Sequence, residues 1–484
     1  MNKRLDLGKE AILPLIIKMS WPSIIAMVAM SLYNFIDTFW LSRLSSQALA
    51  ALTICFPIQM IFAAIGIGTG VGAGSFSARM FGAGKLLKAS QSAGQIFTLS
   101  FFFGFVMIIA ILIFHDGILR YFGANAEIMP LCRDYLIIIV FSSPFLFFSM
   151  MSNNLLRAEG RPLLSMWVVL ISSILSAILD PLLIFGIGPF PRMGIKGAAA
   201  AAVIAQFTAS IFSVYFMLLK SSKYELKCEH LIPNRPIIKS IYSTGLPSIV
   251  INLVVSLVLV VYNHTLSHFG SLAIAALGIC FRVTGLVTMI LFGIGFGLMP
   301  IVGYSEGAKL YGRLKESVFV ALKVAVSIAV ISTILLEIYA ESIVGIFSNE
   351  PALVAIATPA LRLYVSVLIF LAPTLIFINM FMGLGKGTLA MFLLFFRDAL
   401  LLIPLLIIFS SCFGLFGAWL ALPVANIIAF FVILFWAKKE LRRFDYKTYS
   451  ISKSKIIPRR LEGGDEAYDA YVKEADDNAN KGSA

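Results

Sequence analysis

The sequence ALAALTICF at residues 48–56 recurs almost unchanged as AIAALGICF at residues 273–281. Chance similarity between apolar segments does not account for the Pro, Gly and Cys-Phe positions that the two halves share at one offset of about 225 residues. The chain is therefore predicted to contain a duplicated unit. Two further matches fit the same offset without gaps: PSII at 22–25 with PSIV at 247–250, and GIGTGVG at 66–72 with FGIGFGLMP at 292–300.

The composition places this duplicated unit in a membrane. The chain has 484 residues, of which 60% are hydrophobic and only 13% charged, and its mean hydropathy is +0.94. Soluble domains carry about 25% charged residues. Apolar runs of about 20 residues recur along the chain, and each is long enough to cross a bilayer as a helix. Because these runs are continuously apolar rather than alternating, helices are favoured over a barrel.

The fold class predicted is an all-α membrane protein of about twelve transmembrane helices in two six-helix lobes. Because six is an even number, both copies insert the same way up, and their pseudo-twofold axis lies along the membrane normal. The predicted spans are 21–43, 48–74, 92–114, 132–156, 163–186, 194–219, 238–267, 271–302, 317–340, 354–382, 389–411 and 414–436.

Polar stretches mark the boundaries between the predicted parts. The N-terminal lobe is expected at 1–220, a cytoplasmic linker at 221–236, the C-terminal lobe at 237–440 and a polar cytoplasmic tail at 441–484. The tail is polar and mixed in charge, and we expect most of it to be disordered.

The net charge of +13 could suggest nucleic-acid binding, but its placement argues against it. The basic residues gather in connections on one side of the membrane, as in the KKELRR run at 438–443. This asymmetry places both termini in the cytoplasm of a multi-pass plasma (inner) membrane protein. We see no cleavable signal peptide at the start of the chain.

No signature of an enzyme is found. The five cysteines are scattered without CxxC spacing and read as packing residues, and no metal site or cofactor is indicated. A Walker A pattern is absent, so ATP does not drive the protein directly.

Two aspartates lie where the chain is most apolar. Asp37 occurs in SLYNFIDTFWL at 31–41 and Asp180 in SAILDPLLIF at 176–185. A charged Asp at mid-membrane costs roughly 2.5–3.5 kcal/mol, so such residues are functional candidates by default. Counting along the spans places both in the outer half at similar depth. The alternative is that each carboxyl hydrogen-bonds a helix break, as Pro181 after Asp180 would allow.

If they share one hydrated cavity, the two carboxyls form a candidate coupling site. Two neighbouring carboxylates do not ionise together readily, so the pair can take up and release a proton. The same oxygens can hold a sodium ion. Tyr33, one turn before Asp37, and Asn34 are expected to support the site.

The repeat does not duplicate the acidic pair. Tyr262 stands where Asp37 stood, and Ile403 stands near the place of Asp180. The fold therefore does not require these carboxylates, which is the strongest argument from the sequence for a coupling role.

The C-terminal lobe has its own charges inside predicted spans: Arg282, then Arg397 with Asp398. A buried Arg needs a partner, and an Arg282–Asp398 pair is predicted. These residues, with His264 near the outer end of the seventh span, are either structural or in contact with substrate.

The segments LYNFIDTFWLSRL, GAGSFSARMFGAGK and LRAEGRP resemble those of multidrug and toxic compound extrusion (MATE) transporters. The resemblance covers residues 10 to 440, and the Asp37–Asp180 pairing is most similar to the DinF-like and archaeal members. It implies a secondary antiporter that exports amphipathic, often cationic organic compounds in exchange for protons or sodium ions.

The resemblance also extends the site. In the family, a tyrosine and an asparagine of helix four belong to the network around the aspartates, and Tyr135 and Asn153 match those places, with Asn154 beside them. Ser176 stands where family members often carry Asn, and Ala198 stands where some carry Thr. Both changes remove oxygens that coordinate sodium, so we expect protons to be the coupling ion, with sodium as the alternative.

The sequence-based hypothesis is therefore a monomeric, proton-coupled exporter of small organic molecules in a lipid bilayer. One rival is a flippase for lipid-linked oligosaccharides, which Arg282 and Arg397 keep open. A second rival is a channel or receptor without coupling.

Overall fold

The computed structural model describes residues 5–347 and 350–456, and side chains are described as far as residue 445. Within these ranges the chain is helical, with no strand. The N-terminal half comprises α1 (Ile12–Leu44), α2 (Ser46–Gly82), α3 (Leu86–Tyr121), α4 (Met129–Val140), α5 (Ser143–Ala158), α6 (Pro162–Phe185) and α7 (Ile195–Leu218). A short 3₁₀ turn, η1 (Cys228–Leu231), follows. The C-terminal half comprises α8 (Arg235–Ser267), α9 (Ser271–Gly307), α10 (Tyr311–Ile338), α11 (Ala340–Phe347), α12 (Pro351–Ser366), α13 (Leu368–Gly383), α14 (Gly387–Phe395), a π-helical turn η2 (Phe396–Leu402) and α15 (Ile403–Ile456).

These helices form twelve membrane spans. Nine stretches of the described residues are long and apolar enough to cross a bilayer, and two bent pairs of helices bring the number to eleven. The last stretch, Gly387–Asp445, divides at Gly414, whose backbone is not helical, and this gives twelve. The predicted count and the two six-helix lobes are confirmed.

The bent pairs occupy corresponding places in the two repeats. The α4–α5 pair bends by 53° and the α12–α13 pair by 42°. In the first pair, Pro144 is the second residue of α5 and has no N–H to continue the hydrogen-bond ladder of α4. The sequence predicts each pair as a single span, 132–156 and 354–382, and does not indicate the bend.

Several helices continue beyond the predicted apolar spans, because Lys and Arg at their ends are good helix formers. α15 is the largest case: it runs to Ile456 and so includes the first part of the tail. The expected disorder is therefore wrong for 441–456, and residues 457–484 lie outside the described residues.

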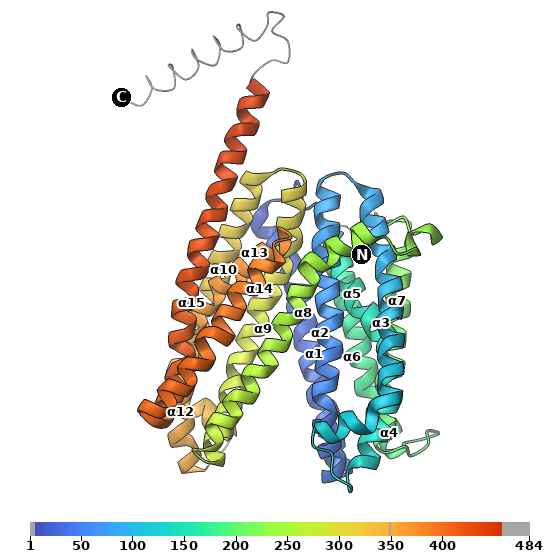
Figure 1. Cartoon of the computed structure of the whole chain (residues 1–484), viewed down its shortest axis with the longest axis vertical. Helices are drawn as coiled ribbons and strands as arrows, with labels where there is room; N and C mark the ends of the chain where they lie inside the picture. The colour runs from blue at the N-terminus through green and yellow to red at the C-terminus, as the bar shows by residue number, and fades with distance from the viewer. Residues whose placement is uncertain (1–4, 348–349, 457–484) are drawn as a thin grey trace, which may run out of the picture. The chain divides into compact units, whose positions relative to one another are not determined.

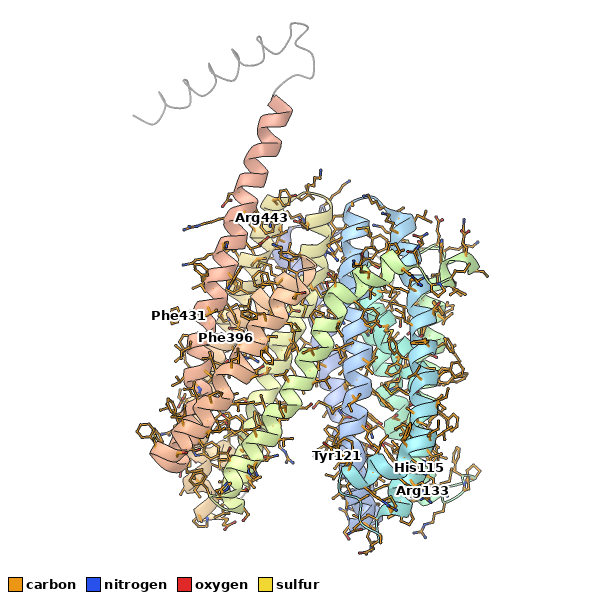
Figure 2. The ribbon with its side chains drawn as sticks, in the orientation of Figure 1. His115, Tyr121, Arg133, Phe396, Phe431 and Arg443 are labelled. Carbon is orange, nitrogen blue, oxygen red and sulfur yellow. The ribbon has the colours of Figure 1, made fainter. Side chains whose placement is uncertain are left out.

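The two halves of the chain lie beside one another as separate groups of helices (Figure 1). They meet at the end of the bundle where α1 and α8 begin and where α2 and α9 end, which we call the closed end. Toward the opposite, open end the helices α1 and α2 diverge from α8 and α9. Large apolar side chains cover the outside, such as Phe431, which is 60% exposed and points away from the bundle (Figure 2).

Glycines let the lobes touch at the closed end. A Cβ atom at Gly68 of α2 would collide with Ile249 of α8, and one at Gly293 of α9 would collide with Ile24 of α1. The repeat offset of about 225 residues relates Gly68 to Gly293 and Ile24 to Ile249, so the two contacts are equivalent. One helical turn nearer the closed end, Gly72 contacts Gly245 and Gly297 contacts Ser20. Both contacts are duplicated, so the repeat confirmed here also shapes the interface between the lobes.

A second layer of contacts lies beyond the glycines. A Cβ at Gly82 would overlap the Tyr304 carbonyl of the other lobe, and one at Gly307 would overlap the Arg79 carbonyl. Arg79 donates a hydrogen bond to the Leu384 carbonyl across the lobes (3.3 Å).

The N-terminal segment bridges the same end. The Leu5 amide donates to the Gly160 carbonyl of the N-terminal lobe (3.1 Å). Arg313 of the C-terminal lobe donates to the carbonyls of Leu7 (2.9 Å) and Glu10 (2.6 Å). The segment is thus held by both lobes and adds to the closure of this end.

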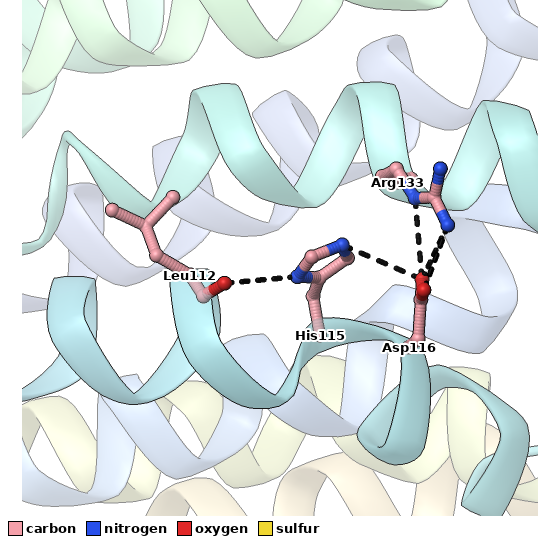
Figure 3. A network of polar contacts seen from close by, with 4 residues as sticks. All are labelled: Leu112, His115, Asp116 and Arg133. Carbon is pink, nitrogen blue, oxygen red and sulfur yellow. Dashed lines mark hydrogen bonds and ion pairs between the residues drawn. The ribbon is translucent and has the colours of Figure 1, made fainter.

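At the open end an ion pair joins α3 to α4. Asp116 accepts from Nη2 of Arg133 at 2.8 Å, and His115 lies beside it with its ring against the Leu112 carbonyl (Figure 3). Both charged side chains are exposed, so the pair contributes only ~0–1 kcal/mol. It provides an exposed aspartate for comparison with the two buried ones.

The glycine contacts predict a specific effect of Gly82→Ala. The added methyl group should overpack the closed end by ~1–3 kcal/mol and favour separation of the lobes there. We expect a Ser20→Cys reporter, made with Cys228 and Cys412 replaced by Ser, to react with a maleimide about tenfold faster or more. The matched control is Gly117→Ala, because Gly117 has no atom near its would-be Cβ. An equal rate in the two variants would contradict the prediction.

Candidate functional site

The two aspartates predicted from the sequence lie together inside the N-terminal lobe. Asp37 on α1 is 8% exposed and Asp180 on α6 is fully buried. α1 packs along α6, and the two carboxyls are close enough to interact electrostatically. Two residues distant in sequence thus share one buried region.

Asp180 carries the most unusual feature of this region. Both of its carboxylate oxygens are buried, and neither has a hydrogen-bond partner among the described residues. Buried polar groups are normally hydrogen-bonded, and an uncompensated buried charge is strongly unfavourable. The carboxyl therefore does not serve as a cap for the helix around Pro181, which was the structural alternative.

Tyr33 and Ser176 border the two carboxyls. Tyr33 interacts electrostatically with both Asp37 and Asp180, and its side chain is within hydrogen-bonding reach of Ser176. Ser176 is buried on α6 one turn before Asp180. The structure brings these two residues to the place where the sequence predicted them.

Tyr135 on α4 completes the group on the side of Asp37, with which it interacts. Its hydroxyl accepts a hydrogen bond from Nε2 of Gln59 on α2 (2.9 Å). Sequence reasoning did not include Gln59. The signal was available, because a glutamine in an otherwise apolar span needs a partner as much as an aspartate does.

Asn153 and Asn154 lie away from the carboxyls, at the closed end. Asn153 donates to the carbonyl of Ser165 (2.8 Å), which precedes Asp180 on α6 by fifteen residues, or about 22 Å of helix. The structure does not bring these asparagines together with the aspartates.

Asn154 belongs instead to a contact between the lobes. Its side-chain oxygen accepts from Nη2 of Arg157 (2.8 Å), and the Arg157 guanidinium lies 4.9 Å from the centre of the Phe296 ring on α9. Asn154 therefore orients a buried cation against an aromatic ring of the other lobe.

Asn34 points elsewhere than Asp37. Its side chain is exposed, three residues before the buried Asp37 on the same helix.

In the C-terminal lobe, Tyr262 is fully buried at the position equivalent to Asp37, with its ring centre 6.4 Å from that of Phe281. The position that Asp37 occupies in the N-terminal lobe is thus taken by an aromatic residue in the C-terminal lobe.

The charged residues of the C-terminal lobe do not pair as predicted. Asp398 forms a bidentate ion pair with its neighbour Arg397, with distances of 2.7 and 2.9 Å, inside the π-helical turn η2. The predicted Arg282–Asp398 pair is therefore wrong. Arg282 on α9 is exposed and has no ion-pair or hydrogen-bond partner among the described residues. His264 is exposed, and its ring contacts that of His268.

The arrangement in the N-terminal lobe can bind a proton or a small cation. It offers two carboxyls, two phenols, a serine hydroxyl and the Gln59 amide in an otherwise apolar surrounding. No group of three or more His, Cys, Asp or Glu residues that could hold a metal ion occurs in the described part of the chain.

Comparison with known proteins agrees with this architecture. The family model MatE matches the chain twice, over residues 22–182 and 247–408. The FAD transporter of Shewanella oneidensis is 28% identical over 437 residues, which cover 88% of this chain and 95% of that protein. The multidrug export protein MepA of Staphylococcus aureus (strain COL) is 28% identical over 422 residues, covering 86% and 92%.

Solved structures give the same result. A structure described as the outward-facing conformation of a multidrug resistance MATE family transporter of the MOP superfamily has a TM-score of 0.86 and 26% identity, covering 92% of this chain and 99% of that one. A MOP superfamily transporter from Pyrococcus furiosus, described as having a binding pocket of reverse polarity, has a TM-score of 0.85 and 25% identity, covering 92% and 100%. The two family matches, each centred on one lobe, show that the chain belongs to the MatE family of multidrug and toxic compound extrusion transporters, and that it is a multi-pass membrane transporter rather than an enzyme.

Proposed function

We propose that this transporter exports small organic molecules by antiport, and that protons entering at Asp37 and Asp180 drive the export. The observation that carries the proposal is the Asp180 carboxyl, fully buried and without a hydrogen-bond partner for either oxygen in the described part of the chain. An ionised carboxylate in that state is costly, whereas a protonated one is tolerated. The group is thus suited to bind a proton in one conformation and to release it in another.

The asymmetry between the lobes supports this role. If the carboxyls served the packing of the fold, their repeat positions would need similar groups. Tyr262 and Ile403 occupy those positions, and Val258 stands where Tyr33 stands in the first repeat. Coupling is therefore assigned to the N-terminal lobe.

Helix α1 supplies a physical link between coupling and transport. It carries Asp37 on the side that faces its own lobe and Ile24 on the side that contacts Gly293 of the other lobe. A change in the protonation of Asp37 or Asp180 alters the packing of α1 on α6. For this to drive transport, the two conformations must differ in their affinity for the proton.

Protons suit the site better than sodium. The family resemblance supports this preference, because Ser176 and Ala198 stand where members often or sometimes carry the oxygen-bearing Asn and Thr. Sodium coupling is the alternative, and the transport experiment below distinguishes the two coupling ions.

We also propose the orientation of the molecule. The closed end carries most of the Lys and Arg residues in the connections, so it faces the cytoplasm of the plasma (inner) membrane with both termini. The open end then faces outward. As the lobe boundaries we propose 1–220 and 237–440. We expect the protein to act as a monomer.

Transport in proteoliposomes tests the coupling site. With an imposed pH gradient, Asp37→Asn or Asp180→Asn should reduce uphill export of a dye at least tenfold, because neither variant can exchange a proton at the altered site. Asp116→Asn, which changes the exposed aspartate of the open end, should leave export unchanged.

Repeating the measurement with a sodium gradient and no pH gradient distinguishes the ions. Export driven by sodium alone would overturn proton coupling. Full export by Asp37→Asn and Asp180→Asn under either gradient would overturn the assignment of the site.

The orientation is tested with the two exposed cysteines, Cys228 in η1 at the closed end and Cys412 beside Gly414 at the open end. In intact cells a membrane-impermeant maleimide should label the Cys228→Ser variant, which keeps Cys412. It should label the Cys412→Ser variant only after lysis. The reverse pattern would show that the closed end faces outward.

A further inference from the structure

Arg282 lies on the face of α9 that is turned toward the other lobe. At the closed end Gly293 of α9 meets Ile24 of α1. Eleven residues make about three full turns of helix, so residues eleven positions apart share a face. Counting eleven positions from this contact toward the open end reaches Arg282 on α9 and Phe35 on α1. The two side chains are therefore level with one another, about 16 Å beyond the contact.

Both side chains are uncovered. Phe35 is 67% exposed, and Arg282 is exposed without a partner among the described residues. An arginine inside a membrane span is costly to turn toward lipid. Its helical phase instead turns it toward the space between the lobes, on the same stripe as Gly293 and Gly297. We call the exposed parts of α1, α2, α8 and α9 beyond the glycine contacts the outer interlobe surface.

The outer interlobe surface has a positive charge and no negative one. α2 and α8 contain no acidic residue, and the one acid of α9, Glu306, lies at the closed end. The one acid of α1, Asp37, lies thirteen residues from Ile24, about three and a half turns, and is buried on the opposite side of the helix.

The positive charge is not a consequence of the repeat. The positions equivalent to Arg282 and Phe35 are Pro57 on α2 and Val260 on α8, which lie eleven positions beyond the contact of Gly68 with Ile249. The pairing of an exposed cation with an exposed ring at this level therefore occurs on the α1–α9 side only. Ser31 and Ser256, each seven positions beyond a contact residue, add hydroxyl groups at neighbouring levels.

We propose that the outer interlobe surface binds amphipathic organic anions, with the anionic group on Arg282 and an aromatic part against Phe35. This inference rests on the proposed export function. It assigns anionic substrates to the transporter, whereas the family resemblance implied substrates that are often cationic. A guanidinium binds carboxylate or phosphate through paired hydrogen bonds, and the weakly solvated surrounding strengthens the attraction. The same charge disfavours a cationic ligand, which contributes to specificity.

A pair of ligands that differ by one phosphate group tests the proposal. Fluorescence polarisation with the purified full chain in detergent at low salt would compare flavin mononucleotide with riboflavin, which has the same ring system and no phosphate. We expect the wild type to bind the mononucleotide about tenfold more tightly. Arg282→Gln should remove this preference, Arg282→Lys should keep most of it, and Phe35→Ala should weaken the binding of both ligands.

Arg120→Gln is the matched control, because it removes one exposed cation at the end of α3 and should leave both affinities unchanged. Size-exclusion profiles establish that each variant is folded. Equal affinity of the wild type for the two flavins, absence of binding, or a preference that survives Arg282→Gln would overturn the proposal. So would tighter binding of ethidium, a cationic dye, than of the mononucleotide.

The test is independent of ion coupling, because it measures binding without a gradient. If Asp37→Asn abolishes pH-driven export but keeps the phosphate preference, both proposals stand. If Asp37→Asn leaves export intact while Arg282→Gln removes the preference, the coupling proposal fails and the substrate class stands.

Discussion

The contact between the lobes at the closed end determines which parts of the transporter are buried and which are open. Gly68 and Gly293, related by the repeat, allow the backbones of facing helices to approach more closely than any other residue would permit. Since the helices diverge from these points, the faces of α1, α2, α8 and α9 beyond them are exposed. A single duplicated contact thus produces the interface and the outer interlobe surface together.

On this symmetric scaffold the two lobes differ in the charged residues of their α1 and α9 helices. The N-terminal lobe buries Asp37 and Asp180 in its interior, while the C-terminal lobe presents Arg282 between the lobes. In the proposed mechanism the acids act from the side of α1 that faces its own lobe, and the arginine binds substrate on the other side. Such a separation suits an antiporter, because the coupling ion and the substrate then act on the same helix, α1, from its two sides.

Much of this could be predicted from the sequence, because apolar length and an exact repeat leave few alternatives. The twelve spans, the two lobes and the group of Asp37, Asp180 and Tyr33 follow from positions along helices, whereas Tyr135 was expected from the family resemblance. What failed depended on neighbours that periodicity does not identify. Asp398 pairs with its neighbour Arg397 inside the π-helical turn rather than with Arg282, and Asn154 contacts Arg157 on its own helix rather than the aspartates. The polar Gln59 in an apolar span was a signal for a partner, but only the folded lobe identifies that partner as Tyr135.

The central claim is that the buried carboxyls exchange a proton in response to substrate. Proton release on substrate binding, recorded with a pH-sensitive dye on the purified transporter in weakly buffered detergent solution, tests it most directly. The account predicts that the wild type releases a proton when it binds substrate, and that the double variant Asp37→Asn, Asp180→Asn binds substrate without release. Release that persists in the double variant, or wild-type binding that releases no proton, would contradict the account.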